Sequence, residues 1–220
     1  MTVGVFDGVH RGHRALIERV LTFDPRALPV IITFRQNHKK RNPAYPGDIN
    51  SFRQKIALFE SLGISLVVAA DLNVSFRHMG GAEFLGLLRE RGNMRFLAVG
   101  SNFRCGYHLD TDASGIKDMN AREWIPTDIV ETLTEDGEVI SSSRIRKAIF
   151  QGKLGEAQAM LSRPHILDLG DGAGQVLPPP GSYGVKFHER DGSSRAGKIE
   201  IEQGGIVDAP PTAEYIEFLA

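Results

Sequence analysis

The first half of the chain alternates short apolar runs with stretches of helical periodicity. The apolar runs are rich in β-branched residues and are bounded by glycine, proline or polar segments, which is typical of buried strands. They cover residues 2–6, 30–34, 64–70 and 96–100. Helical patterns cover 11–21, 82–91 and a helix that ends at Gly63 and opens on a capping box, Ser51 with Gln54. Alternation at this spacing predicts an α/β fold, a parallel sheet wound by right-handed crossovers.

The remainder of the chain has a different pattern. A strand is expected over 127–134 and a strand remnant over 138–140, followed by helices over 143–151 and 154–161. After Pro164 the composition shifts to turn-forming residues, at 170–174 and 178–181. Alternating apolar residues beyond them predict a small β-module with almost no helix. We therefore expect two domains, 1–165 and 166–220.

Composition excludes several classes of protein. Of 220 residues, 41% are hydrophobic, which is too many for a disordered chain. The 26 basic and 27 acidic residues give a net charge of −1, so no overall field attracts nucleic acid or an anionic membrane. The sequence shows neither a membrane-spanning run nor a signal pattern, and its single cysteine excludes an internal disulfide. We expect a cytoplasmic protein that binds small molecules and neither nucleic acid nor membrane.

The segment from Gly4 to His13 carries the strongest chemical signal. A predicted strand passes into a glycine-containing turn, and a helix begins directly after it. This arrangement aims backbone N–H groups and the positive end of the helix dipole at one point, which favours phosphate binding. His10 and His13 project to the same side of the helix start, and Gly12 between them leaves room for a ligand. A zinc site would need a third ligand, which the nearby sequence does not offer.

This segment, GVFDGVHRGH, resembles the GxFDGxHxGH motif of the nucleotidyltransferase superfamily. Further segments are similar, in order and spacing, to the FAD synthetase half of the bacterial riboflavin kinase/FAD synthetase family. These segments are Thr33-Phe34 (TF), Gly100–Gly106 (GSNFRCG), Ile140–Arg146 (ISSSRIR) and Leu161–Pro164 (LSRP). The resemblance runs from Met1 to His165 and implies a Rossmann-like nucleotidyltransferase domain.

The resemblance implies an ATP:FMN adenylyltransferase that forms FAD and pyrophosphate, with Mg²⁺ arriving on ATP. The implied catalytic residues are His10, His13, Asn102, Ser142 and Arg146. The implied ATP-binding residues are Gly4, Val5, Phe6, Asp7, Gly8, Gly12, Gly100, Ser141 and Ser143. On the flavin or acceptor side they are Phe34, His38 and Phe103, and no residue is assigned to a dedicated metal site.

The residue types suit these roles. Serine hydroxyls at a loop-to-helix junction can hold phosphates, although capping of the helix explains Ser141 equally well. A positioned guanidinium binds phosphate oxygens in a fork, and we expect Arg146 in that role, with Arg144 and Arg11 on the solvated surface. Asn102 follows the fourth strand, at the carboxyl edge of the sheet where ligands bind in α/β folds.

Departures from the family pattern leave two alternatives open. The basic run Arg35–Arg41 replaces a Pro-His-Pro segment and either grips the acceptor phosphate or is a solvated loop. Cys105 replaces an aromatic residue, and we expect it to pack as a small apolar side chain. The tail segment Leu177–Val185 is similar to a strand of the riboflavin kinase domain, but the GxPTAN motif that should precede it is absent, so we expect a barrel remnant without kinase activity. The alternatives are a nucleotidyltransferase for another phosphorylated acceptor and an inactive nucleotide- or flavin-binding module.

Overall fold

The computed structural model describes residues 1–35, 45–71, 76, 78–170, 174–203 and 205–219. Its internal contacts divide the chain into two compact units. The first unit comprises Met1–Phe6, Gly12–His38 and Leu58–Leu133. The second comprises Asp7–Arg11, Lys39–Ala57 and Thr134–Ala220. The domain boundary that the sequence predicts at residue 165 stays a prediction.

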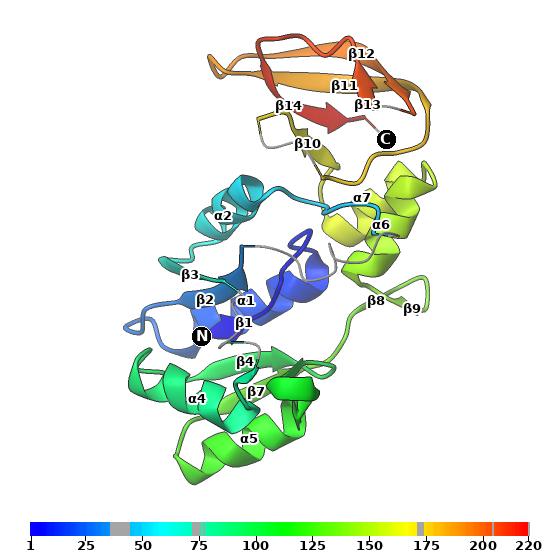
Figure 1. Ribbon diagram of the computed structural model, residues 1–220. Coiled ribbons are helices and arrows are strands. Elements are labelled where there is room, and N and C mark those ends of the chain that lie inside the picture. Colours follow the sequence, from blue (N-terminus) through cyan, green and yellow to red (C-terminus); the bar gives the residue numbers. More distant parts are fainter. Residues whose placement is uncertain (36–44, 72–75, 77, 171–173, 204, 220) are drawn as a thin grey trace. The chain divides into compact units, whose positions relative to one another are not determined.

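The first unit is built on a five-stranded sheet in the order β3-β2-β1-β4-β7 (Figure 1). Every neighbouring pair of strands in it is parallel. The strands are β1 Thr2–Val3, β2 Val30–Phe34, β3 Leu66–Ala70, β4 Leu97–Gly100 and β7 Thr127–Val130. The predicted Rossmann-like α/β class is confirmed by this sheet and its flanking helices.

Helices cover both faces of this sheet. Helices α4 (Gly81–Glu90) and α5 (Ala113–Arg122) lie together on one side (Figure 1) and pack in one cluster with Leu97 and Val99 of β4. Ala98, which alternates with them, packs with Val20 of helix α1 (Arg11–Phe23). A small pair of strands, β5 (Arg104–Cys105) and β6 (Thr111–Asp112), flanks the 3₁₀ helix η2 (Tyr107–Leu109). The strands β2 and β4 are therefore buried on both faces, as their unbroken apolar runs require, whereas Leu66 and Val68 of the edge strand β3 are exposed.

Two local expectations have different outcomes. The strand expected over 2–6 is too long: it ends at Val3, because Phe6 takes a left-handed φ of 52° as the chain turns out of the sheet. The capping box expected at Ser51 is confirmed. The backbone N–H of Ser51 donates to the Gln54 side chain at 2.9 Å and the Gln54 N–H donates back to the Ser51 hydroxyl at 3.2 Å, at the start of α2 (Phe52–Ser61).

The second unit joins two helices to an antiparallel sheet. Helices α6 (Ser142–Phe150) and α7 (Leu154–Leu161) follow a short hairpin, β8 (Thr134–Glu135) and β9 (Glu138–Val139). The C-terminal sheet has the order β10-β14-β11-β12-β13. Its strands are β10 Ile166–Asp168, β11 Gly181–Glu189, β12 Ser194–Glu202, β13 Gly205–Val207 and β14 Ala213–Phe218. The predicted C-terminal β-module is thus present.

One hydrophobic cluster holds the second unit together. It combines side chains of α6 and α7, such as Ile149 and Met160, with side chains of the C-terminal sheet, such as Val185 and Ile216. All four side chains are fully buried. The helices that carry the predicted serine and arginine residues therefore share a core with the C-terminal sheet. Across the described ranges, every helix is too short or too polar to pass through a bilayer.

Candidate functional site

The turn that contains Gly8 has an unusual backbone. Phe6, Gly8 and Val9 have φ values of 52°, 86° and 39°, in the left-handed region that β-branched residues strongly disfavour. A Cβ atom at Gly8 would lie 3.0 Å from a methyl group of Ile49 and 3.3 Å from Leu161. Strained backbone of this kind clusters at ligand sites, where the surrounding structure holds it in place.

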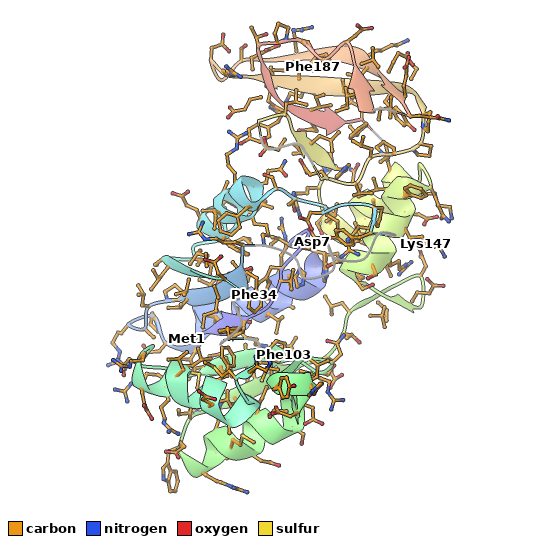
Figure 2. All side chains as sticks on the ribbon, viewed as in Figure 1. Met1, Asp7, Phe34, Phe103, Lys147 and Phe187 are labelled. Atoms are coloured by element: carbon orange, nitrogen blue, oxygen red, sulfur yellow. The ribbon has the colours of Figure 1, made fainter. Side chains whose placement is uncertain are left out.

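Several polar groups, from Ile49, Asn50 and helix α6, contact Asp7, which is labelled in Figure 2. Its side chain is buried, and one carboxylate oxygen accepts backbone N–H groups of Ile49 at 2.8 Å and Asn50 at 3.3 Å. The other oxygen lies 3.2 Å from Nε of Arg146. Burial, together with the nearby charge of Asp48, raises the pKa of the Asp7 carboxyl, while Arg146 opposes that change.

Arg146 is held from several sides at the start of α6. Besides its ion pair with Asp7, its guanidinium lies 4.9 Å from the centre of the Tyr45 ring, and one nitrogen lies 3.4 Å from the hydroxyl of Ser143. The hydroxyl of Ser142 donates to the backbone carbonyl of Asp7 at 2.8 Å. Four of the predicted site residues are thus brought together in the second unit. Each lies on one of two segments that are far apart in the sequence.

Ser141 caps helix α6, because its hydroxyl accepts the backbone N–H of Arg144 at 3.2 Å. The Arg144 side chain is not solvated as expected: it donates to the carbonyls of Glu135 and Glu138 at 2.9 and 2.8 Å. Arg11 pairs with the Glu135 carboxylate, so the expectation of a simply exposed side chain is wrong there too. Both arginines anchor the β8–β9 hairpin, a tertiary contact that local sequence does not encode.

Arg163 supports the same turn, a role that the sequence alone does not predict. Its guanidinium donates to the carbonyl of Gly8, to that of Val9 at 3.4 Å and to the Asn50 side chain at 3.0 Å. It therefore holds the strained turn from the side of the carbonyl groups. Arg163 lies within the LSRP segment that carries the family resemblance, which is the signal that could have drawn attention to it.

His10 belongs to the same turn and is buried. Burial and the positive charge of Arg163 lower its pKa to about 4. The ring is therefore neutral at pH 7, where an imidazole offers one N–H donor and one acceptor nitrogen. In this state it can donate a hydrogen bond to a phosphate oxygen without first carrying a charge.

The first unit holds the other predicted ATP-side residues. The N–H of Gly4 donates to the carbonyl of Ile32 at 3.0 Å, and the hydroxyl of Thr33 donates to the carbonyl of Val5 at 3.2 Å. The ring of His13 meets the buried ring of Phe6 edge to face, with 5.1 Å between their centres. Gly12 lies in the first turn of α1, next to His13.

The acceptor-side residues follow the carboxyl ends of two strands in the same parallel sheet. Phe34 ends β2, and Phe103 comes shortly after β4 (Figure 2). Gly100 ends β4, and Asn102 lies exposed in the turn that follows, with the N–H of Phe103 donating to the Gly100 carbonyl at 2.9 Å. Parallel strands present their carboxyl ends at one edge, where ligands of α/β proteins bind.

Three further expectations concern this side of the site. His38 lies outside the described residues, as do the other members of the basic run except Arg35, which pairs with Asp71 at 3.7 Å. Cys105 is half-buried against the core of the first unit, and burial raises the pKa of its thiol to about 11. In the described ranges, no three histidine, cysteine or acidic side chains gather closely enough to hold a metal ion.

Comparison with known proteins identifies the family. A family model described as FAD synthetase matches residues 1–144. The chain belongs to the FAD synthetase family. The match covers the first unit, the Asp7–Arg11 turn and the first residues of α6, and it ends at Arg144, two residues before Arg146. The resemblance drawn from the sequence is thereby confirmed.

Curated relatives of this FAD synthetase family member are bifunctional riboflavin kinase/FMN adenylyltransferases. The protein of Escherichia coli strain K12 is 26% identical over 181 residues, which cover 76% of this chain and 55% of the relative. That of Pseudomonas fluorescens is 26% identical over 220 residues, covering 98% of this chain and 66% of the relative. The chain thus spans about 55% to 66% of the length of these two relatives.

A solved structure shares the fold. The crystal structure of a macrolide-efflux protein from Streptococcus pneumoniae superposes with a TM-score of 0.79 and 20% sequence identity. The match covers 99% of this chain and 83% of that one. At this identity the likeness concerns the fold alone.

Proposed function

We propose that the chain is an adenylyltransferase that joins AMP from ATP to FMN, giving FAD and pyrophosphate. A phosphate oxygen of FMN would form a bond to the α-phosphorus of ATP. The bond between that phosphorus and the oxygen that bridges to the β-phosphate would break in line, and pyrophosphate would leave with the bonding electrons. No covalent intermediate on the protein is needed.

The meeting of the Asp7 turn with the start of α6 is the observation that supports this proposal. It places the buried guanidinium of Arg146 close to the N-terminus of α6 and to the turn that carries His10. Such a combination of fixed donors suits an anionic triphosphate. The family match and the names of the relatives support ATP and FMN as the two substrates.

Each group of site residues would have its own role in binding or catalysis. Backbone groups of Gly4–Gly8 and Gly12 would line the nucleotide pocket. The hydroxyls of Ser141–Ser143 and the guanidinium of Arg146 would hold phosphate oxygens. His10 and His13 would stabilise the charge that develops on the phosphates, and Asn102 would orient the acceptor phosphate. Phe34 and Phe103 would contact the flavin, as would His38.

Mg²⁺ would arrive as part of the substrate, bound to the phosphates of ATP, where it neutralises charge. Both oxygens of the buried Asp7 carboxylate are engaged by neighbouring donors. The remaining ligands of the ion would therefore be phosphate oxygens and water. The protein contributes position and hydrogen-bond donors, which is the usual division in phosphoryl transfer.

A product assay tests this function. Purified protein is incubated with Mg²⁺ and either ATP or CTP against FMN, riboflavin and other phosphorylated acceptors, and the products are separated by chromatography. The proposal expects FAD and pyrophosphate in equal amounts from ATP and FMN. Transfer to a different phosphorylated acceptor only, or tight nucleotide binding without turnover, would reject it.

The histidines give a sharper test of the mechanism. Replacing His13 with alanine should lower kcat by about 100-fold or more, because one preorganised donor to the developing charge is lost. His78→Ala is the control, since His78 lies in the first unit, outside the matched motifs. Initial rates of FAD formation measure both variants, and an unchanged rate in His13→Ala would contradict the assigned role.

A further inference from the structure

The segment Asp48–Ser51 makes hydrogen bonds in two directions within the second unit. Towards the turn, the N–H groups of Ile49 and Asn50 donate to the carboxylate of Asp7. Because the same carboxylate pairs with Arg146, the position of these two N–H groups helps to set where the guanidinium lies. The segment is therefore a support of the proposed phosphate site.

In the other direction, the same peptide groups bind the chain that leads into the C-terminal sheet. Asp48 pairs with Gln175 as an isolated parallel bridge, with its N–H donating to Gly174 at 2.7 Å and its carbonyl accepting from Val176 at 2.9 Å. The side-chain amide of Gln175 donates to the carbonyl of Ile49 at 3.0 Å. One peptide segment thus faces Asp7 with its N–H groups and Gln175 with its carbonyl.

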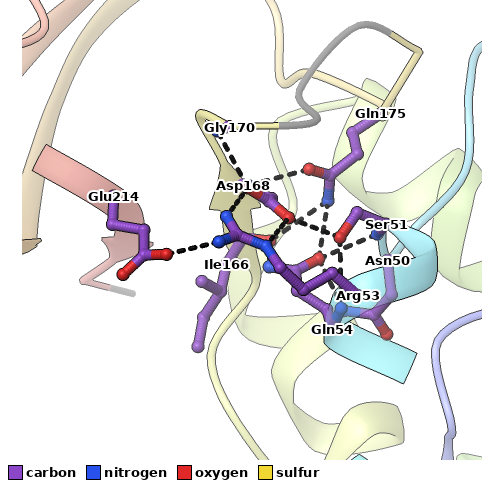
Figure 3. Close-up of polar contacts among 9 residues, drawn as sticks. All are labelled: Asn50, Ser51, Arg53, Gln54, Ile166, Asp168, Gly170, Gln175 and Glu214. Carbon is purple, nitrogen blue, oxygen red and sulfur yellow. Dashed lines mark hydrogen bonds and ion pairs between the residues drawn. The ribbon is translucent and has the colours of Figure 1, made fainter. Parts of the chain in front are cut away.

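Gln175 is itself fixed by a buried polar network (Figure 3). Its side-chain oxygen accepts the backbone N–H of Asp168 at 2.8 Å, and its nitrogen also reaches the Gln54 side chain at 3.1 Å. Asp168 is 0% exposed and accepts the Ser51 hydroxyl at 2.6 Å. Since each polar group of such a network loses its partner if another moves, the network permits little displacement.

Arg53 ties this network to two strands of the C-terminal sheet. Its guanidinium pairs with Asp168 of β10 and with Glu214 of β14 (Figure 3). It also lies 4.8 Å from the centre of the Tyr215 ring. The contacts therefore run from the C-terminal sheet, through Gln175 and the segment Asp48–Ser51, to Asp7 and Arg146.

We propose that the C-terminal sheet is a positioning element for the nucleotide site, and that Gln175 is the positioning residue through which it acts. The hydrogen bonds of the Gln175 side chain go to Ile49, Gln54, Ile166 and Asp168, none of which is assigned to substrate, and through Ile49 they hold the N–H groups that fix Asp7. A small displacement of a phosphate-binding group can lower the reaction rate of an enzyme strongly. A residue that fixes the position of Asp7 and Arg146 therefore affects catalysis. The inference rests on the proposed function, because it names what positions that same site.

The test compares three substitutions in the full-length chain. Gln175→Met keeps the length and the packing of the side chain and removes its hydrogen bonds. Gln175→Asn is the second variant, in which the amide is one methylene too short to reach both Asp168 and Ile49. Glu200→Gln is the matched control, because Glu200 lies exposed on β12 of the same sheet. Each variant is measured by amide hydrogen exchange without ligand and by steady-state kinetics with ATP and FMN.

For both Gln175 variants the proposal expects exchange at the Ile49 and Asn50 amides to become about tenfold faster. It also expects KM for ATP to rise about tenfold, with kcat and KM for FMN within about threefold of the parent values. The control should match the parent in every measurement. A lower melting temperature with KM for ATP unchanged would assign Gln175 a purely structural role and overturn the proposal.

The two proposals fail separately. If the parent chain makes no FAD, the proposed function is rejected, and the exchange measurement still decides whether Gln175 holds the segment beside Asp7. If the parent is active and exchange at Ile49 and Asn50 is unchanged in both variants, the positioning proposal is wrong while the function stands. If Gln175→Met fails to fold, Gln175→Asn supplies the same comparison.

Discussion

Replacing Arg146 with methionine tests the ion pair at the centre of the site. The substitution leaves the Asp7 carboxylate, on a side chain that is 5% exposed, without its cationic partner. Removing one member of a buried pair typically costs 3 to 5 kcal/mol, and the two remaining backbone N–H bonds to Asp7 place this case near the lower end, at about 3 kcal/mol. With a urea slope of about 2 kcal/mol per molar, the unfolding midpoint should fall by about 1.5 M.

The stability lost in Arg146→Met should depend on pH, and the direction of that dependence follows from the pKa of Asp7. Burial raises the pKa of the Asp7 carboxyl above its ordinary value, and loss of Arg146 removes an opposing influence. An acid whose pKa is raised in the folded state lowers the free energy of unfolding at pH values above that pKa, where it is ionised. This loss of stability disappears as the pH falls through the raised pKa, because the acid becomes protonated. The defect of Arg146→Met should therefore be largest near pH 8 and smaller near pH 5.

Far-UV circular dichroism during urea unfolding measures this effect. The double variant Asp7→Asn/Arg146→Met should recover at least half of the lost stability, because no buried charge remains. Arg26→Met, which removes an exposed pair with Asp24, should leave the midpoint unchanged. Equal stability of Arg146→Met and the parent at pH 8 would refute the reasoning, as would a double variant no more stable than the single one.

Three other predictions concern single residues. In an NMR titration of the ligand-free protein, the ring protons of His10 should move with a midpoint near pH 4, and a midpoint near 6.5 would contradict its burial beside Arg163. Gly8→Ala should lower the unfolding free energy by about 1 to 2 kcal/mol in urea melts, since φ is 86° there, whereas Gly86→Ala, in open space, should not. Because burial raises the pKa of Cys105 to about 11, iodoacetamide at pH 8 should label the native thiol about 100-fold more slowly than the urea-unfolded one; equal rates would show an exposed thiol.

The parallel sheet could be predicted because its signals are local. The β-branched run at Val30–Phe34 gave both ends of β2 correctly, and the capping box at Ser51 gave the start of α2. Helix α5 was missed, since its sequence ASGIKDMNAR carries few apolar residues and its start is set by Asp112, whose side chain accepts the N–H of Gly115. Such a helix forms through capping and packing rather than through periodicity.

The sequence predicts the motif residues of the proposed site but not the groups that support them. The glycine turn, the histidines and the serine–arginine segment are short patterns that a sequence displays directly. Two partners of Asp7 are the backbone N–H groups of Ile49 and Asn50. Because every residue except proline carries such a group, the residue types do not reveal this contact. The roles of Arg163 and Gln175 depend on contacts between segments more than 100 residues apart, which only the folded chain brings together.

A crystal structure of the protein with FMN and a non-hydrolysable ATP analogue tests the central claim most directly. We predict that the triphosphate lies within hydrogen-bond distance of His10, His13 and the start of α6, with the FMN phosphate facing the α-phosphorus. A triphosphate bound elsewhere, with both histidine rings still packed against protein, would contradict the assignment of this turn as the nucleotide site.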